Sequence, residues 1–267
     1  MFLLTVIFFI FGIFGKYNQQ TSIISNLTLL NPHVKENGRN QNFIYDGYYT
    51  VLTKGYSNYT QLGYYSPNVN ATLQSKEPIK RKNFKFEINF TLDNLSKGGR
   101  GFGFWISSPL KTGPFYGRNS DYKGFGVILD TSANSFLQFV DSDGTKGKKV
   151  YLKSPTFIQA LFISHEYPRV SITYSAPKQK GEIIYEGNSN IQVSHVLGIS
   201  GHTGNSSTVM KLFSIMGNSL TTVKKEFVAG ESQKSSKTIL FIGAAGILSL
   251  VYYLYTKQNR KNLDQLK

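Results

Sequence analysis

Residues 84–92 alternate strictly between apolar and polar side chains. The sequence FKFEINFTL places its phenylalanines, isoleucine and leucine on one face and its polar residues on the other. A period of two residues predicts a half-buried antiparallel β-strand. Residues 101–107 (GFGFWIS) form another apolar run after a glycine-rich turn. Residues 124–130 (GFGVILD) are apolar on both faces, so this strand is expected at the centre of a sheet.

Later segments are typical of hairpins. Residues 135–152 contain two apolar runs joined at Asp143 and Gly144, a pair that favours tight hairpin turns. Further strands are expected at residues 160–167, 169–176, 182–187, 196–204 and 209–217. Short strands, glycine-containing turns and the lack of a convincing amphipathic helix predict one all-β sandwich domain over residues 17–218.

The two ends of the chain differ from its middle. Residues 1–16 are almost purely apolar, which predicts a secretory signal peptide, with a retained N-terminal anchor as the alternative. Residues 239–255 carry no charge, and a helix of that length just spans a hydrocarbon core. The sequence therefore predicts a lumenal body, a polar stalk at 219–238, one transmembrane helix and a cytoplasmic tail at 256–267.

The composition of the chain limits the cellular compartments and the classes of binding partner that can be expected. Six Asn-x-Ser/Thr sequons, compatible with a lumenal body, occur at Asn26, Asn58, Asn70, Asn89, Asn94 and Asn205. The chain has no cysteine, which excludes thiolate metal sites and cysteine nucleophiles. A net charge of +15 would suggest nucleic acid in a soluble nuclear protein. The N-terminal signal argues against a nucleic-acid partner. The basic residues are scattered, which favours solvated loops, and attraction to anionic glycans or acidic partners is the alternative.

No pattern in the chain predicts an enzyme. A glycosidase needs two carboxylates about 5–9 Å apart, and no strand places two or three acidic residues toward one groove. Trp105 is expected in the core, and His165 and His202 are expected at the surface or in turns. The stalk at 219–238 has no heptads, so no coiled-coil oligomer is expected.

Three segments, in this order, resemble one family. They are GGRGFGFWISSP at 98–109, GPFYGRNSDYKGFGVILDT at 113–131 and GISGHTGNSSTVMKLFSI at 198–215. Most of residues 28–217 is similar to the L-type, or legume-lectin-like, domain of ER–Golgi cargo receptors. The resemblance implies a concanavalin-like antiparallel β-sandwich that binds high-mannose N-glycans on secretory glycoproteins, with Ca²⁺ organising the site.

The resemblance also implies which residues bind calcium. The family pattern supplies an aspartate, a backbone carbonyl two residues later and an asparagine four residues later, and Asp130, Ser132 and Asn134 match it. Calcium takes several oxygen ligands at about 2.3–2.6 Å. A further carboxylate is expected from the next loop, where Asp141 and Asp143 are the candidates. The alternative is that Asp130 and Asn134 merely shape a polar turn.

The resemblance also implies a set of sugar-contacting residues, but this chain matches that part of the family pattern less fully than the calcium-binding part. They fall on Thr60, Asn134, Gly204, Asn205 and Ser206. Arg100 stands where the family has an aspartate that accepts hydrogen bonds from mannose, and arginine is a donor only. The family's sugar-contacting histidine is missing, because no histidine lies between His33 and His165. A glycan on the Asn205 sequon would crowd the site.

The function expected from the sequence is a single-pass type I receptor of the ER/Golgi membrane. Its lumenal domain would bind glycoprotein cargo that carries high-mannose glycans, and the cell surface is an alternative location. Two other functions stay open: a lectin-like module that has lost sugar binding and binds proteins in the secretory pathway, or a surface adhesin for acidic glycans. Asp130 and Asn134 favour the receptor, whereas Arg100 and the missing histidine favour the protein-binding module.

Overall fold

The computed structural model describes residues 18–30, 33–34, 40–52, 58–63, 67–93, 100–131, 134–153, 156–189, 191–205 and 208–223. The expected signal peptide at 1–16, the span at 239–255 and the tail at 256–267 lie outside these ranges. Within the ranges, no helix has the length and apolar character that crossing a bilayer requires. Nearly all of the described chain belongs to one compact unit, Gln19–Val223.

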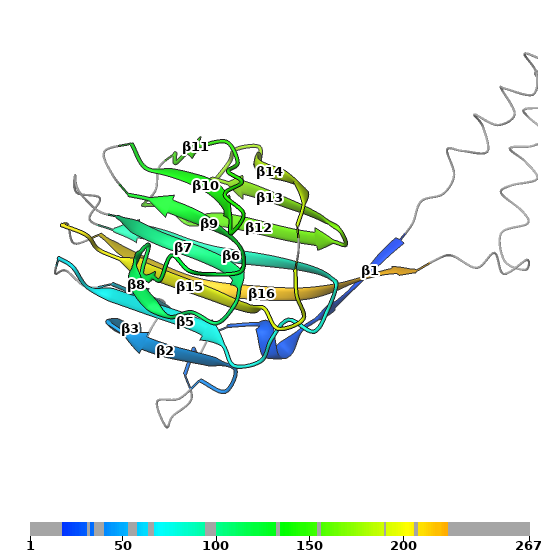
Figure 1. The fold of residues 1–267 in the computed structure, drawn as a ribbon, viewed down its shortest axis with the longest axis horizontal. Helices are drawn as coiled ribbons and strands as arrows, with labels where there is room; N and C mark the ends of the chain where they lie inside the picture. The colour runs from blue at the N-terminus through cyan, green and yellow to red at the C-terminus, as the bar shows by residue number, and fades with distance from the viewer. Residues whose placement is uncertain are drawn as a thin grey trace, which may run out of the picture. The chain divides into compact units, whose positions relative to one another are not determined.

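Two antiparallel β-sheets pack face to face (Figure 1). The eight-stranded sheet has the order β14-β13-β12-β6-β16-β4-β3, and β1 also pairs with β16. Its strands are β1 (Asn18–Ile23), β3 (Tyr49–Leu52), β4 (Tyr59–Leu62), β6 (Asn83–Asp93), β12 (Gln159–Glu166), β13 (Arg169–Ser175), β14 (Glu182–Asn188) and β16 (Val209–Val223).

The seven-stranded sheet has the order β11-β10-β9-β7-β15-β5-β2. Its strands are β2 (Phe43–Gly47), β5 (Asn70–Ser75), β7 (Gly101–Ser107), β9 (Gly124–Asp130), β10 (Phe136–Asp141), β11 (Val150–Tyr151) and β15 (Val196–His202). The short strand β8 (Thr112–Phe115) and the 3₁₀ helix η1 (Ser25–Leu27) lie outside both strand orders. This arrangement confirms the predicted all-β sandwich.

The alternation along β6 explains how the core forms. Phe84, Phe86 and Ile88 are fully buried, while the polar residues between them are only half-buried, as the two-residue period predicts. Inward-facing residues of both sheets belong to one hydrophobic cluster. Each large apolar side chain buried in this way contributes about 1.5–3 kcal/mol of transfer free energy.

The position of β9 and the predicted hairpins are also confirmed. β9 lies between β10 and β7, with buried residues on both of its faces. β10 pairs with β11 after a turn in which Gly144 has a φ of +91°, a conformation that favours glycine. β12 pairs with β13 along its whole length after Ala160. Local sequence patterns therefore placed these strands correctly.

A second apolar cluster covers the outer face of the seven-stranded sheet. Trp105, Ile128 and Val140 point away from the main core and are buried under side chains of the segment 110–122. Figure 1 shows β8, which belongs to this segment, lying in front of β7 and β15. The buried Arg118 guanidinium stacks 4.7 Å from the centre of the Trp105 ring, which fastens the segment to the sheet.

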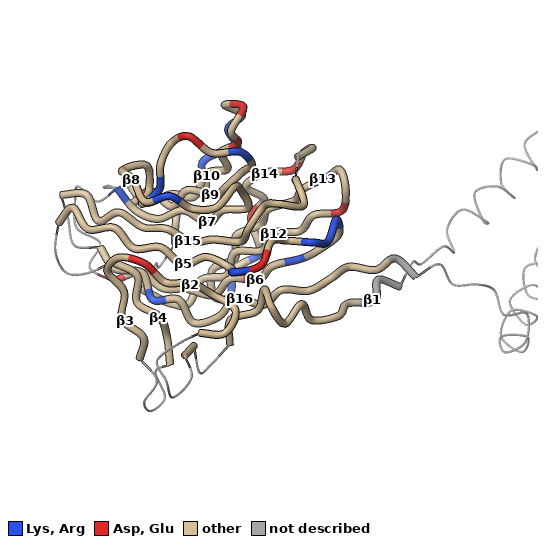
Figure 2. Tube along the Cα trace, turned by 60° about the horizontal axis from the view of Figure 1, so that its bottom comes forward, with Lys and Arg blue, Asp and Glu red and all other residues tan. Residues whose placement is uncertain are grey.

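Charged residues are distributed over the whole described surface. Figure 2 shows lysine and arginine on several strands and loops, with acidic residues between them. In the described part of the chain they do not gather into the single basic stripe that is typical of nucleic-acid-binding domains.

Three details differ from the sequence-based expectations. β16 continues to Val223, past the boundary predicted at residue 218, because its backbone pairs with β1 and β6 and Leu220 is buried. His165 is buried in β12 instead of lying at the surface, because the alternation of this strand turns it inward against Phe84. His202 ends β15 and is half-buried, so it is not a surface residue either.

Candidate functional site

Three neighbouring strands of the seven-stranded sheet bring candidate residues to one edge. β9 ends at Asp130, β7 begins at Gly101 directly after Arg100, and β15 ends at His202. The register pairs Gly101 with His202, and Phe102 with Leu129, so these three strand ends lie side by side. We call this the Asp130 edge. It contains Arg100, Asp130, His202 and the loop that follows β15.

Tyr116 reaches the Asp130 edge from the segment that covers the sheet. Its hydroxyl donates a hydrogen bond of 2.9 Å to Oδ2 of Asp130. The backbone oxygen of Tyr116 accepts a hydrogen bond from Ser200, whose Oγ in turn accepts one of 2.8 Å from Nε1 of Trp105. Gly117 has a φ of +84°, and a Cβ atom there would lie 2.3 Å from the backbone oxygen of Gly201. The loop therefore holds the phenol against Asp130 with little freedom.

Arg100 places a positive charge beside this hydrogen bond. Its Nη1 donates to the backbone oxygen of Pro114 at 3.1 Å. Burial raises the pKa of Tyr116, the Asp130 charge raises it further, and Arg100 lowers it. Burial lowers the pKa of His202, and Arg100 lowers it too. The positive charge of Arg100 therefore acts on both side chains, and the lowered pKa of His202 keeps its imidazole neutral at pH 7.

The loop after β15 is fixed against the turn that precedes β5. Gly204 accepts a hydrogen bond of 2.6 Å from the Asn68 amide, and its own N–H donates to Nδ1 of His202 at 2.7 Å. The φ of +60° at Gly204 is in the left-handed region that favours glycine. Asn205 follows in an exposed turn. Because β15 and β9 are separated by one strand, this loop lies about 10 Å from Asp130 across the sheet.

Two of the predicted calcium ligands are at the wrong end of the sheet. Asp141 pairs with Phe125, while Asp130 pairs with Phe136. Five residues along a strand span roughly 17 Å. Asp143 lies two residues beyond Asp141, in the turn at that far end. The prediction that either residue completes a site with Asp130 is therefore wrong, because the antiparallel hairpin carries the chain away from it.

The predicted sugar contact at Thr60 is also wrong. Thr60 belongs to β4 of the other sheet and is fully buried, with its hydroxyl 2.7 Å from Nδ1 of His33. It has no exposed surface for a ligand. Asn134 lies within the described residues. It is exposed and follows β9, the strand that ends at Asp130, as expected. Ser132 and Ser206 lie outside the described residues.

The described residues around Asp130 do not by themselves fit a calcium ion. The strand beside Phe136 is β11, and Leu152, just after it, donates its N–H to the Ser135 oxygen at 2.9 Å. On this side the Lys149 ammonium lies 4.2 Å from the centre of the Phe136 ring. Within the described ranges, no three His, Asp or Glu side chains gather where they could hold a metal ion. Calcium takes about six to eight oxygen ligands, and here one carboxylate has a cationic neighbour.

We expect calcium to leave the thermal stability of the protein unchanged. A site filled at 100 times its dissociation constant would add about 2.7 kcal/mol, a Tm rise of roughly 5–10 °C for a domain of this size. The measurement is differential scanning calorimetry in calcium and in EGTA, with Asp130→Asn as the matched variant. A calcium-specific rise that Asp130→Asn removes would show that the site does bind the ion.

Sequence reasoning missed Tyr116. The loop GPFYG was noted as a family-like segment, but no role was given to its tyrosine. The contact with Asp130 joins residues that are 14 positions apart. A signal was present in the sequence, since an aromatic residue followed by glycine in a covering loop favours a tight approach to the sheet.

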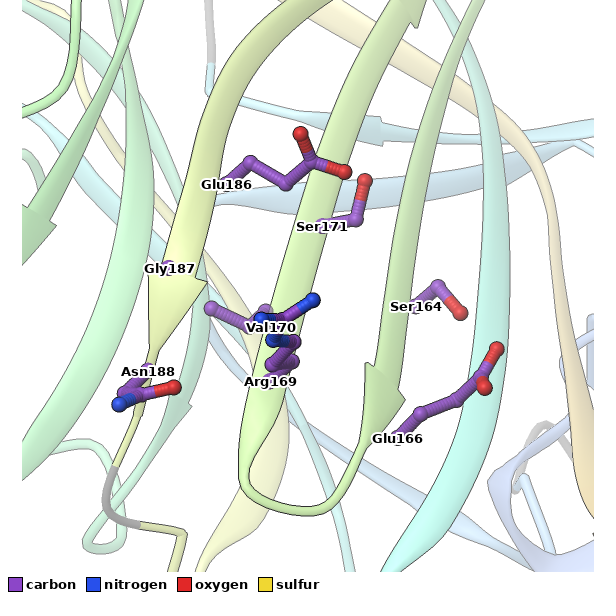
Figure 3. A pocket seen from close by; sticks show the side chains of 8 residues that line it. All are labelled: Ser164, Glu166, Arg169, Val170, Ser171, Glu186, Gly187 and Asn188. Carbon is purple, nitrogen blue, oxygen red and sulfur yellow. The ribbon is translucent and has the colours of Figure 1, made fainter. Parts of the chain in front are cut away.

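A further pocket lies away from the Asp130 edge. Its volume is about 610 Å³, and it is formed on β12, β13 and β14. Figure 3 shows Glu186 and Ser171 next to one another on adjacent strands, in agreement with their paired register. The polar residues that line the pocket include Ser164, Glu166, Arg169, Ser171, Glu186 and Asn188. None of them comes from the strands that form the Asp130 edge.

A sandwich of two antiparallel sheets is shared by several classes of protein, so the class of this one is decided by comparing sequences. The sequence model of the legume-like lectin family matches residues 22–227. The chain belongs to the legume-like lectin family. It is also 24% identical over 253 residues to an L-type lectin-like domain-containing protein of Schizosaccharomyces pombe, covering 82% of this chain and 79% of the relative.

Solved structures show the same fold. The exoplasmic/lumenal domain of VIP36, solved with Ca²⁺ and mannose bound, matches with a TM-score of 0.66 and 14% identity over 78% of this chain and 94% of that one. A legume lectin-like domain from Entamoeba histolytica matches with a TM-score of 0.63 and 18% identity over 73% and 98%. The carbohydrate recognition domain of Emp47p matches with a TM-score of 0.59 and 12% identity over 74% and 96%.

Proposed function

We propose that this protein is a lectin-like receptor of the secretory pathway that binds high-mannose N-glycans on glycoprotein cargo. Membership of the legume-like lectin family supports glycan binding. The mannose-bound structure of VIP36 supports the sugar class, and its description as an exoplasmic/lumenal domain supports the compartment. The apolar segment at 239–255 would anchor the receptor as a single-pass type I protein of the ER/Golgi membrane.

One observation carries the proposal: an acceptor and a donor lie side by side at the Asp130 edge. Asp130 accepts a hydrogen bond from the Tyr116 hydroxyl, and Arg100 donates one to the Pro114 oxygen, two residues before Tyr116 in the same segment. Each sugar hydroxyl both donates and accepts, so two adjacent hydroxyls can pair with the carboxylate and with the guanidinium. Asn134 and Asn205, which are both exposed at the same edge, would supply the remaining contacts.

In this arrangement the glycan binds without calcium. Asp130 and Asn134 would be the residues to hold the ion, but they supply too few oxygens, and the positive charge of Arg100 opposes a divalent cation. The positive charge next to Asp130 is then the Arg100 guanidinium and not a calcium ion. Sugar binding would depend on hydrogen bonds from Arg100, whereas a calcium-dependent lectin depends on a bound metal ion. The proposed activity is binding, without catalysis.

A second candidate function is the recognition of acidic glycans. It is favoured by the cations near this edge, Arg100 and Lys149. An anionic sugar would pair with both, whereas the Asp130 carboxylate would repel it. The two candidates therefore differ in how binding responds to ionic strength, because interactions between exposed charges are screened by salt.

A glycan array tests both candidates in one experiment. The full-length chain is applied to neutral high-mannose glycans and to sulfated and phosphorylated glycans, in calcium and in EGTA. The proposal predicts equal high-mannose signals in both buffers, and salt-sensitive binding to acidic glycans alone would favour the second candidate. Silence on every glycan would rule out both and leave a protein-binding module.

A further inference from the structure

Two aromatic side chains continue a row of outward-facing residues that begins at Asp130. The register pairs Asp130 of β9 with Phe136 of β10, and Phe136 with Tyr151 of β11, which are successive neighbours in the sheet (Figure 1). The residues next to these three in sequence belong to the main core, namely Leu129, Leu137 and Val150. Side chains alternate between the two faces of a strand, so Asp130, Phe136 and Tyr151 share the outer face. Since neighbouring strands lie about 4.8 Å apart, Tyr151 is roughly 10 Å from Asp130 across the sheet.

Tyr151 is the more accessible of the two aromatic residues. It is 55% exposed, whereas Phe136 is half-buried. The two rings meet edge to face, with their centres 6.1 Å apart, and the Lys149 ammonium lies 4.2 Å from the centre of the Phe136 ring. The backbone here is paired, because the Leu152 N–H donates to the Ser135 oxygen at 2.9 Å. Tyr151 is therefore held on a hydrogen-bonded strand, with accessible surface and an ammonium donor nearby.

The covering segment 110–122 limits the direction in which a glycan bound at Asp130 can extend. On the side of β15, Ser200 donates a hydrogen bond to the Tyr116 backbone oxygen, so the segment lies over that strand. On the side of β10 and β11, the outer apolar cluster beneath the segment includes neither aromatic residue of the row, as far as the chain is described. The accessible path from Asp130 therefore runs toward Tyr151.

We propose that Tyr151 forms a second sugar subsite, in which its ring stacks on a mannose residue next to the one bound at Asp130. This inference rests on the function proposed above and adds the length of glycan that the site recognises. One face of a hexose ring carries mainly C–H groups, whose slightly positive hydrogens match the negative face of an aromatic ring. Lys149 supplies a donor for the hydroxyl groups at the rim of that residue. A separation of about two strand spacings suits two consecutive sugar residues.

Ligand-observed NMR in EGTA tests the subsite in the full-length chain. The probes are methyl α-mannoside and an α-linked mannotriose. We expect Tyr151→Ala to weaken mannotriose binding about tenfold, as the loss of one aromatic contact of about 1.4 kcal/mol would do, and to leave the affinity for methyl α-mannoside unchanged. Ring protons of one mannose residue should shift upfield with the native chain and not with Tyr151→Ala. Because Tyr151 is exposed, the fold should persist, which an unchanged melting temperature would verify.

Two matched variants accompany the measurement. Tyr151→Phe keeps the ring and should keep the affinity for mannotriose. Tyr167→Ala removes a tyrosine that is 60% exposed in the turn between β12 and β13, and should change neither affinity.

Three results would overturn the subsite. Tyr151→Ala could bind both probes as the native chain does, which would leave the receptor function standing without a second subsite. It could weaken both probes equally, which would mean that the ring only supports the Asp130 edge. Chemical cross-linking could show a native dimer that Tyr151→Ala converts to a monomer, which would assign the ring to contact with a second copy. If the native chain binds neither probe, the receptor function itself fails and the subsite fails with it.

Discussion

Replacing Trp105 with alanine is expected to lower the free energy of unfolding by about 3–5 kcal/mol, the usual cost of removing a large buried aromatic side chain. Trp105 is fully buried under the segment 110–122. The variant would lose the hydrogen bond to Ser200 and the stacking partner of the buried Arg118 guanidinium. Chemical denaturation followed by circular dichroism measures the loss.

The same variant should also lose glycan binding before it unfolds. Trp105 supports Ser200, which holds the backbone of Tyr116 in place for its bond to Asp130. Trp105→Phe is the matched control, since it keeps much of the apolar surface and removes only the indole N–H and part of the volume. If Trp105→Ala is as stable as the native chain, the covering segment does not depend on this ring and the packing described here is incorrect.

Changing Arg100 to aspartate is expected to weaken high-mannose binding in EGTA by about tenfold to a hundredfold, because a hydrogen bond from a charged group is worth about 1.5–3 kcal/mol. Aspartate is the residue implied at this position by the family resemblance, so the change reverses the departure seen in this chain. It also puts a second carboxylate next to Asp130, which removes the donor and adds like-charge repulsion. Isothermal titration calorimetry measures the affinity.

Two controls accompany this change. Arg100→Lys keeps the positive charge and a donor, and should retain part of the affinity. Arg81→Asp makes the same charge change at an exposed position in another part of the chain and should have little effect. Unchanged binding by Arg100→Asp in EGTA would mean that Arg100 donates no hydrogen bond to the sugar, and tighter binding would mean that Arg100 obstructs it.

The fold could be predicted from the sequence because its signals are local. The alternation in β6 and the two-sided burial of β9 depend only on neighbouring residues. The same logic could have placed His165 in the core, since it continues the inward positions of Leu161 and Ile163 along β12. A histidine can be buried when its ring stacks on an aromatic side chain and bonds to the backbone, as His165 does with Phe84 and Lys82.

The site was harder to predict because it depends on which strand ends meet. Asp130 could be predicted as a site residue because it matches the family pattern, whereas Arg100 was expected to oppose sugar binding. Asp141 and Asp143 follow Asp130 closely in sequence, but the hairpin carries them to the other end of the strand. Thr60 lies in a strand whose pattern does not reveal to which sheet it belongs. Tyr116 acts through a contact that only the covering segment creates.

Glycan binding at the Asp130 edge in the absence of calcium is the central claim, and one calorimetric titration tests it most directly. A high-mannose oligosaccharide is titrated into the full-length chain, once in EGTA and once in calcium. Our account predicts the same dissociation constant in EGTA and in calcium, and the loss of binding when Asp130→Ala is added. Binding that appears only in calcium, or no binding in either buffer, would contradict it.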